Sequence, residues 1–246
     1  SGCGRIPFVS MATRPVRQRR LGPFAMSWNL MESTSVLTRC GDDLFCIAVD
    51  TPQDAQSLAR ALREAGGWLE VVPGIASVVV RFDAVAHDSK GARQTLAAVI
   101  ERGVDGLDTP DEFLEIPVVY GGECGPDLEA LAEATGLSAD ELIARHTRDE
   151  YSVDMVGFTP GFAFVGGLDA CFQVPRRAEP RQRVAAGSVG IADGRTGLYA
   201  MASPGGWNII GRTPHRLFDP DAADPFALKA GMRVRFRAID AAELDA

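Results

Sequence analysis

Residues 151–214 are the part of the chain that most constrains its fold. Glycine, proline and arginine gather there in four clusters: GFTPGF at 157–162, PRRAEPRQR at 175–183, AGSVGI at 186–191 and SPGGW at 203–207. Glycine adopts positive φ and lets a second backbone approach closely, so Gly-rich turns between short apolar runs are typical of the corners of a β-barrel. This stretch predicts a mainly-β domain.

Composition limits the partners that the chain can have. Its 246 residues are 46% hydrophobic, enough for one large or two ordinary domains with a buried core. The net charge of −8 argues against nucleic acid or an anionic membrane as the main partner, because both attract basic surfaces. No apolar run approaches the roughly 20 residues of a membrane span. We expect a soluble protein with neither kind of partner.

Cysteine and histidine indicate neither a disulfide framework nor a metal site. The 5 cysteines are odd in number, widely spaced and without a CxxC pair, which favours reduced thiols in the cytoplasm. No pair of His or Cys has metal-ligand spacing, and no HExxH, P-loop or dinucleotide fingerprint occurs. We expect a cytoplasmic location, no metal site, and no Walker A lysine.

Residues 1–33 are interpreted as a disordered or extraneous Arg-rich extension. Residues 1–31 contain arginines but no acid, and they show no helical or strand period. A targeting peptide is the alternative interpretation. Its apolar part, residues 21–26, is interrupted by Gly22 and Pro23 and lacks a proper hydrophobic region. We therefore leave this stretch out of the fold.

Residues 34–115 are predicted to form an α+β sandwich domain. A helix begins at Pro52, carries apolar residues at helical spacing, and ends at Gly66 and Gly67. A second helix is expected around residues 93–102. Strands are expected at 36–40, 44–49, 68–72, 77–82 and 113–119. Paired strands alternating with two helices predict a sheet with both helices on one face.

Residues 116–246 are predicted to form the mainly-β domain, with helices near its start. One helix covers residues 126–134 and ends at Gly136. Ser138 and Glu141 form the spacing of a capping box that opens the next helix. His146 lies on the last turn of that helix, where the helix dipole favours a protonated imidazole.

Two long segments carry a family resemblance. Residues 115–168 read EIPVVYGGECGPDLEALAEATGLSADELIARHTRDEYSVDMVGFTPGFAFVGGL, and residues 175–220 read PRRAEPRQRVAAGSVGIADGRTGLYAMASPGGWNIIGRTPHRLFDP. They closely resemble the PxpB/KipI family, also called allophanate hydrolase subunit 1 or the C/D carboxyltransferase domain. The resemblance covers about residues 34–239, with several motifs in order. It implies an α+β N-terminal domain followed by a cyclophilin-like β-barrel.

The resemblance also implies a function. Members look like the B subunit of an ATP-dependent 5-oxoprolinase, which opens the lactam of 5-oxo-L-proline to give L-glutamate together with a homologous C subunit and an A subunit. ATP, with Mg²⁺ and shared with a partner protein, is the implied cofactor. Two alternatives are a carboxyltransferase component of the urea-carboxylase or allophanate type, and a histidine-kinase inhibitor.

The resemblance and the residue chemistry together indicate a candidate site. His146 is interpreted either as an acid/base or substrate-orienting group or as a helix C-terminal cation, and Arg177 is the second catalytic candidate. Arginine forks and glycine backbone amides suit phosphate or carboxylate oxygens. Ser188 lacks a Ser-His-Asp arrangement and is interpreted as a hydroxyl donor. The expected substrate and ATP ligands are Arg176, Arg181, Gly187, Ser188, Thr196, Gly205, Gly206 and Arg212.

A solvated loop is the alternative for the arginine cluster, although Pro175 and Pro180 stiffen it. The aromatic residues of the site are expected in the barrel core or in a pocket wall. The residues expected to shape the pocket are Gly157, Phe158, Pro160, Gly161 and Trp207. Phe164 and Arg195 depart from the family pattern, in which tyrosine and glutamine are usual. These two departures are expected to affect substrate preference.

Overall fold

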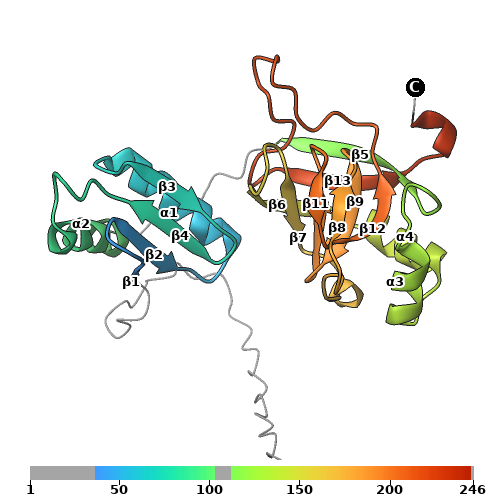
Figure 1. Cartoon of the computed structure of the whole chain (residues 1–246), viewed down its shortest axis with the longest axis horizontal. Helices are drawn as coiled ribbons and strands as arrows, with labels where there is room; N and C mark the ends of the chain where they lie inside the picture. The colour runs from blue at the N-terminus through green and yellow to red at the C-terminus, as the bar shows by residue number, and fades with distance from the viewer. Residues whose placement is uncertain (1–36, 103–111, 245–246) are drawn as a thin grey trace, which may run out of the picture. The chain divides into compact units, whose positions relative to one another are not determined.

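The structure is a computed structural model, and it describes residues 37–102 and 112–244 (Figure 1). The extension interpreted at residues 1–33 lies outside the described residues. Within those two ranges, no helix combines the length and the apolar character needed to cross a membrane.

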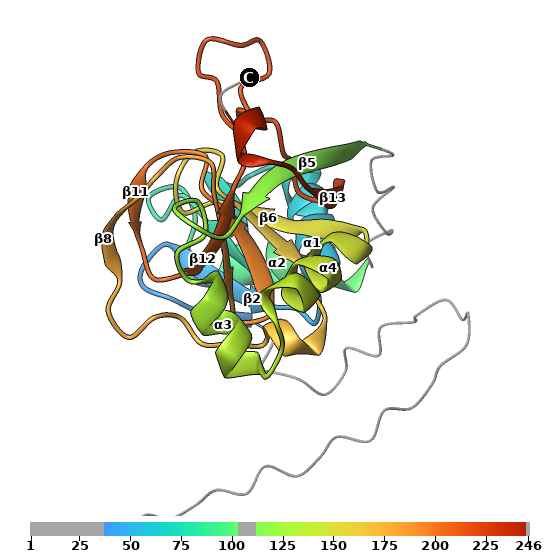
Figure 2. The same ribbon diagram turned by 90° about the vertical axis from the view of Figure 1, so that its right-hand side faces the viewer.

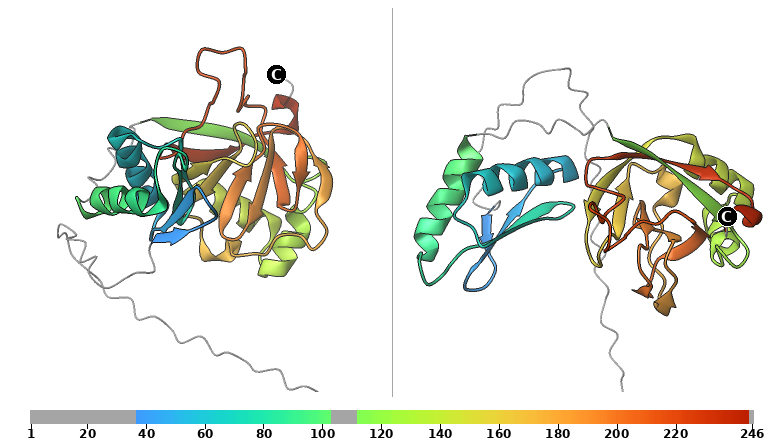
Figure 3. Two further views of the ribbon diagram at one scale, coloured as in Figure 1. Left: turned by 60° about the vertical axis from the view of Figure 1, so that its left-hand side comes forward. Right: turned by 90° about the horizontal axis from the view of Figure 1, so that it is seen from above.

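The first half contains an antiparallel four-stranded sheet of order β1-β2-β4-β3. Helices α1 (Pro52–Ala65) and α2 (Ser89–Glu101) cover one face of it (Figure 3). Val78 and Val80 on alternate positions of β4 are fully buried, together with Leu62 and Leu96 from the helices. This arrangement agrees with the predicted α+β layer. The strands are β1 (Leu37–Arg39), β2 (Leu44–Ala48), β3 (Glu70–Pro73) and β4 (Ser77–Arg81).

Local signals define the ends of these two helices. The Thr51 hydroxyl accepts from the Asp54 amide at 3.1 Å, and the Asp54 carboxylate accepts in return from the Thr51 amide. Gly66 ends α1 with φ 70°. Asp88 caps α2 by accepting from the Gly91 amide at 2.7 Å, so this helix begins four residues earlier than predicted.

The second half is a closed barrel of order β10-β7-β6-β13-β5-β12-β9, which confirms the predicted β-barrel (Figure 1). Strands β5 and β13 pair in parallel, and all other neighbours pair antiparallel. The predicted domain boundary at 115/116 stays a prediction, and it falls within β5. The strands are β5 (Phe113–Tyr120), β6 (Tyr151–Val156), β7 (Ala163–Gly166), β9 (Ser188–Ala192), β10 (Arg195–Leu198), β12 (Asn208–Arg212) and β13 (Arg233–Ala238).

Two helices pack against the barrel. Helix α3 (Leu128–Thr135) contacts β12, and α4 (Ala139–Arg148) contacts β13 (Figure 2). The predicted capping box opens α4, because the Ser138 hydroxyl accepts from the Glu141 amide at 3.2 Å and the Glu141 carboxylate accepts from the Ser138 amide at 2.8 Å. The barrel interior is filled by residues such as Val165 and Ile191.

A second apolar cluster covers the outer face of the barrel. Phe162 and Phe164 belong to this cluster, whereas the alternating residues Ala163 and Val165 face the interior. A short sheet of β8 (Arg181–Val184) and β11 (Ser203–Gly205) contributes Val184 to the cluster. The remaining members of the outer cluster are Ala192, Tyr199, Trp207 and Ile209.

Candidate functional site

The predicted site residues occupy separate places in the barrel. His146 and Thr196 lie in the interior core. Arg177 and Arg181 lie around a carboxylate near the Asn208 end of β12. Gly187 and Arg212 line a pocket at the other end of that strand. The residues that the sequence suggested as one site are therefore spread over three separate places in the barrel.

His146 is an interior residue that links helix α4 to the barrel wall. Its side chain is fully buried, with the imidazole stacked on the Phe236 ring at a centroid distance of 4.2 Å. Its Nδ1 lies 2.6 Å from the Tyr120 hydroxyl, and its Nε2 lies 2.7 Å from the Thr196 hydroxyl. Both ring nitrogens are therefore occupied by strands β5 and β10.

Burial sets the charge of this imidazole. It lowers the pKa of His146 to about 3, so the ring is neutral near neutral pH. The interpretation as a helix C-terminal cation is wrong, because the low-dielectric interior disfavours the charged form more than the helix dipole favours it. With no exposed surface, His146 also has no route to a substrate in this conformation. The same holds for Thr196, which is fully buried beside it.

Asp127 organises the predicted arginine cluster. Its carboxylate accepts from Arg177 Nη1 at 2.7 Å, from Arg181 Nη1 at 2.7 Å and Nη2 at 2.9 Å, and from the Ile209 amide at 2.6 Å. Burial raises the pKa of Asp127, but the Arg181 and Ile209 hydrogen bonds outweigh it, and the pKa lies below its usual value. A charged carboxylate thus anchors both arginines.

The segment 175–181 is held to the barrel at several further points. The Arg177 amide donates to the Gly206 carbonyl at 2.7 Å, and Asn208 Nδ2 donates to the Pro175 carbonyl at 3.0 Å. Arg176 lies over the Trp207 ring at 5.4 Å and pairs with the exposed Asp193 at 3.4 Å. The segment is therefore anchored by side chain and backbone, but most of its residues are exposed, so the solvated-loop alternative stays open.

Sequence reasoning missed Asp127. It precedes α3 at the N-cap position but makes no capping hydrogen bond there. An aspartate before a helix is the ordinary signal of a cap. Nothing local in the sequence distinguishes that role from pairing with arginines 50 and 54 positions away.

Gly187 and Ser188 were expected to bind substrate or ATP oxygens, but their backbone N–H groups do not form an anion-binding nest. The Gly187 amide donates to the Tyr199 carbonyl at 2.7 Å, and the Ser188 amide donates to the Ala185 carbonyl at 3.3 Å. A nest needs free N–H groups, and both donors are used within the chain. Gly205 lies in β11 and pairs with Arg181. The Ser188 side chain is also buried, with 4% of its surface exposed.

A pocket of about 460 Å³ lies at the Arg212 end of β12. Its lining includes Gly187, Ala200, Arg212, His215 and Phe218. The GFTPGF loop borders it, because a Cβ added to Gly161 would lie 2.9 Å from the Cβ atoms of Ala200 and Phe218. Of the predicted residues, the pocket brings together Gly187 and Arg212, with Gly161 behind its wall.

The GFTPGF loop presents one aromatic side chain to solvent. The Gly157 amide donates to the Phe162 carbonyl and the Phe162 amide to the Thr159 carbonyl, both at 3.0 Å, so the loop is closed. Phe158 is 69% exposed and has φ 76°, which is uncommon outside glycine. Its expected place in the core is wrong, and its expected place in a pocket wall stays a prediction. Phe164 and Trp207, by contrast, are buried in the outer cluster as expected.

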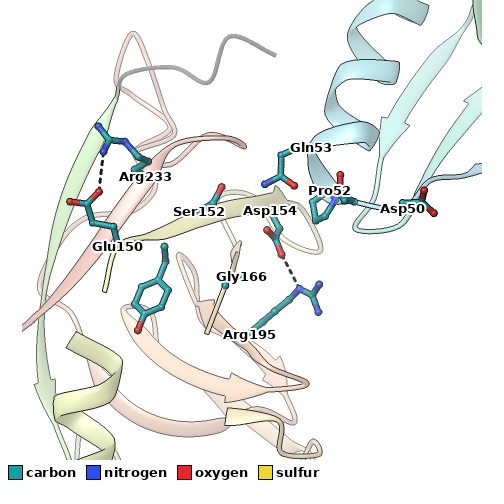
Figure 4. A pocket seen from close by; sticks show the side chains of 12 residues that line it. Asp50, Pro52, Gln53, Glu150, Ser152, Asp154, Gly166, Arg195 and Arg233 are labelled. Carbon is teal, nitrogen blue, oxygen red and sulfur yellow. Dashed lines mark hydrogen bonds and ion pairs between the residues drawn. The ribbon is translucent and has the colours of Figure 1, made fainter. Parts of the chain in front are cut away.

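Two ion pairs lie on the wall of another pocket. Arg195 Nε donates to Asp154 Oδ2 at 3.0 Å, and Glu150 pairs with Arg233 at 2.9 Å (Figure 4). Asp154 sits at an irregularity in the pairing of β6 with β7 and lies directly over Gly166, where any Cβ would clash with it. Burial raises the pKa of Asp154, although Arg195 opposes the shift. The unusual Arg195 therefore has a specific partner.

Comparisons with known proteins place the chain in a family. A model described as "Carboxyltransferase domain, subdomain C and D" matches residues 26–228. The 5-oxoprolinase B subunit of Bacillus subtilis is 38% identical over 180 residues, which cover 69% of this chain and 75% of that protein. The corresponding protein of Escherichia coli O157:H7 is 41% identical over 179 residues, which cover 73% and 82%.

Solved structures resemble the chain as well. A conserved uncharacterized protein of Pyrococcus horikoshii is 38% identical, with a TM-score of 0.53 over 85% of this chain and 100% of that one. Urea carboxylase of Kluyveromyces lactis, at 18% identity, shares the fold with a TM-score of 0.69 over 85% of this chain and 22% of its own. The chain belongs to the carboxyltransferase subdomain C and D family, together with the bacterial 5-oxoprolinase B subunits.

Proposed function

We propose that this chain is the B subunit of a cytoplasmic, ATP-dependent 5-oxoprolinase, which phosphorylates and hydrolyses 5-oxo-L-proline to L-glutamate with the A and C subunits. The observation that carries the proposal is the 38–41% identity to proteins of that name, over most of both chains. The likeness to the urea enzyme, at 18% identity, supports a common fold alone.

The chemistry of the described barrel suits such a role. A lactam is a poor electrophile, and phosphorylation of its oxygen by ATP creates a better leaving group. The protein groups needed are donors to carboxylate and phosphate oxygens. Arg177 and Arg181 share the single negative charge of Asp127, and these contacts hold segment 175–181 in place. Arg176 pairs with Asp193, both side chains being exposed, so it is the arginine of that segment that fits a phosphate at a surface shared with a partner.

The test is 5-oxo-L-proline-dependent ATP hydrolysis with glutamate detection. The chain is assayed alone, with the A or the C subunit, and with both. We expect glutamate only from the complete set, because the proposed site is completed at shared surfaces. Absence of glutamate in every combination would contradict the proposal, and would favour an amide-carboxylating component or a kinase inhibitor.

A further inference from the structure

The pocket at the Arg212 end of β12 has the size and lining of a small-molecule site. Its volume of about 460 Å³ lies within the range of roughly 300–1,000 Å³ that is usual for ligand pockets. Ala186, Ala200, Pro214, Leu217 and Phe218 supply apolar surface. Such sites combine an apolar wall with a few placed polar groups. The polar group that matters here is the guanidinium of Arg212.

The guanidinium of Arg212 is fixed through its Nε atom, while its Nη atoms have no partner among the described residues. Its Nε donates to the Ala186 carbonyl at 3.2 Å, and within residues 37–102 and 112–244 its Nη atoms have no protein acceptor. The other arginine of the pocket differs, because Arg216 Nη1 pairs with Asp219 at 2.8 Å. The pocket therefore has one guanidinium without a counter-charge in the described part of the chain, already oriented by its own backbone contact.

The backbone beside Arg212 is tightly packed. The Thr213 amide donates to the Gly187 carbonyl at 2.9 Å, and the Gly187 amide donates to Tyr199. Gly187 has φ 80°, and a Cβ there would lie 2.5 Å from the Thr213 carbonyl oxygen. Only glycine fits that conformation at that separation. The segment that carries the Ala186 acceptor is thus fixed against β12 before any ligand arrives, which lowers the cost of binding.

Among the described residues, the Arg212 guanidinium is the one in this pocket without a carboxylate partner, and beside apolar surface it suits a small monocarboxylate. Two parallel N–H groups match the two oxygens of a carboxylate. A nucleoside triphosphate carries several negative charges, which one uncompensated arginine does not balance. We propose that this pocket binds the carboxylate of the lactam substrate through Arg212, with the ring against the apolar wall. This assignment rests on the proposed function and adds the place where the substrate is held.

The direct test is binding to the full chain, followed by NMR amide shifts and calorimetry. The probes are 5-oxo-L-proline and its carboxamide, 5-oxo-L-prolinamide, which lacks the negative charge. We expect 5-oxo-L-proline to shift the amides of Gly187 and Thr213. We expect Arg212→Ala, and separately the carboxamide, to weaken binding by about 10- to 100-fold, since hydrogen bonds to charged groups are worth that much.

Arg216→Ala is the matched control, because that arginine lines the same pocket but already pairs with Asp219. We expect it to change affinity less than about threefold. Equal binding of the acid and the carboxamide, equal losses in the two arginine variants, or shifts confined to other parts of the barrel would overturn the assignment.

A second readout separates this assignment from the proposed function. In the complex with the A and C subunits, Arg212→Ala should raise KM for 5-oxo-L-proline about tenfold or more. An active complex whose KM is unchanged by Arg212→Ala would overturn the pocket assignment and leave the function standing. An inactive complex, with Arg212-dependent binding of the acid by the chain, would overturn the function and support the carboxylate pocket.

Discussion

His146 shows how a single residue changes meaning between sequence and structure. On a predicted helix end it has the features of a cation, and before a glycine-rich block it has the features of a catalytic base. In the barrel it is a neutral, buried link between the hydroxyls of Tyr120 and Thr196. Its place opposite those two strands follows from barrel closure. No local sequence pattern predicts that closure.

This burial makes stability depend on pH. The folded-state pKa of about 3 lies below the unfolded value of about 6.5. Between these values the unfolded chain binds a proton that the folded chain does not. The free energy of unfolding should therefore fall as pH drops below 6.5, with a contribution of up to about 1.4 kcal/mol per pH unit.

Urea unfolding from pH 7.5 to 5.5 measures this effect. His146→Gln, which cannot titrate, should lose that part of the pH dependence. His87→Gln is the control, because His87 is exposed, and it should keep the wild-type dependence. Identical pH dependence in wild type and His146→Gln would contradict the argument.

Asp127 supports a second prediction at the residue scale. Asp127→Asn keeps the shape of the side chain but removes the charge that Arg177 and Arg181 share. We expect the free energy of unfolding to fall by about 1–3 kcal/mol, because two partly buried cations lose their counter-charge.

Asp193→Asn is the matched control in chemical denaturation. Asp193 also pairs with an arginine of this segment, but that pair is exposed, and its loss should change the free energy of unfolding by less than about 0.5 kcal/mol. Similar losses of unfolding free energy in Asp127→Asn and Asp193→Asn would contradict the prediction that the more buried ion pair contributes more to stability.

At the scale of elements, the turn before β9 is held by backbone contacts. Gly187→Ala places a Cβ 2.5 Å from the Thr213 carbonyl oxygen and also forces alanine into φ 80°. We expect the free energy of unfolding, measured by heat or urea, to fall by about 2–4 kcal/mol, because a steric clash adds to backbone strain.

Gly122→Ala isolates the strain. Gly122 has φ 53°, and nothing lies within 4 Å of an added Cβ. Gly122→Ala should lower the free energy of unfolding by about 1–2 kcal/mol. A Gly187→Ala variant no less stable than Gly122→Ala would show that the β12 contact is not rigid.

The sequence predicted the presence of the helices better than it predicted where a polar first turn begins. The apolar period and the Pro52 and Gly66 signals located α1, and the Ser138 capping box located α4. Helix α2 was predicted to begin near residue 93, but it begins at Ser89. Its first three residues, Ser89, Lys90 and Gly91, carry no apolar side chain that would indicate a helix, and the Asp88 cap defines its start.

At the scale of the whole molecule, the barrel is closed by pairings between distant segments. Strand β13 pairs with β5 in parallel and with β6 antiparallel, and β12 pairs with both β5 and β9. These pairings place Arg212 beside Ala186 and Asp127 beside Arg177. The glycine and arginine clusters indicated that a site exists, while barrel closure determines which of their members meet.

The sequence by itself determined the barrel class, the helix caps and the family, because periodicity, capping and ordered motifs are local properties of the chain. The tertiary structure alone decided that His146 is neutral, that Asp127 pairs with two arginines, and that Arg212 lines a pocket with its Nη atoms unpaired among the described residues. Charge state and ligand access depend on burial and on partners far away along the chain, and only packing sets both.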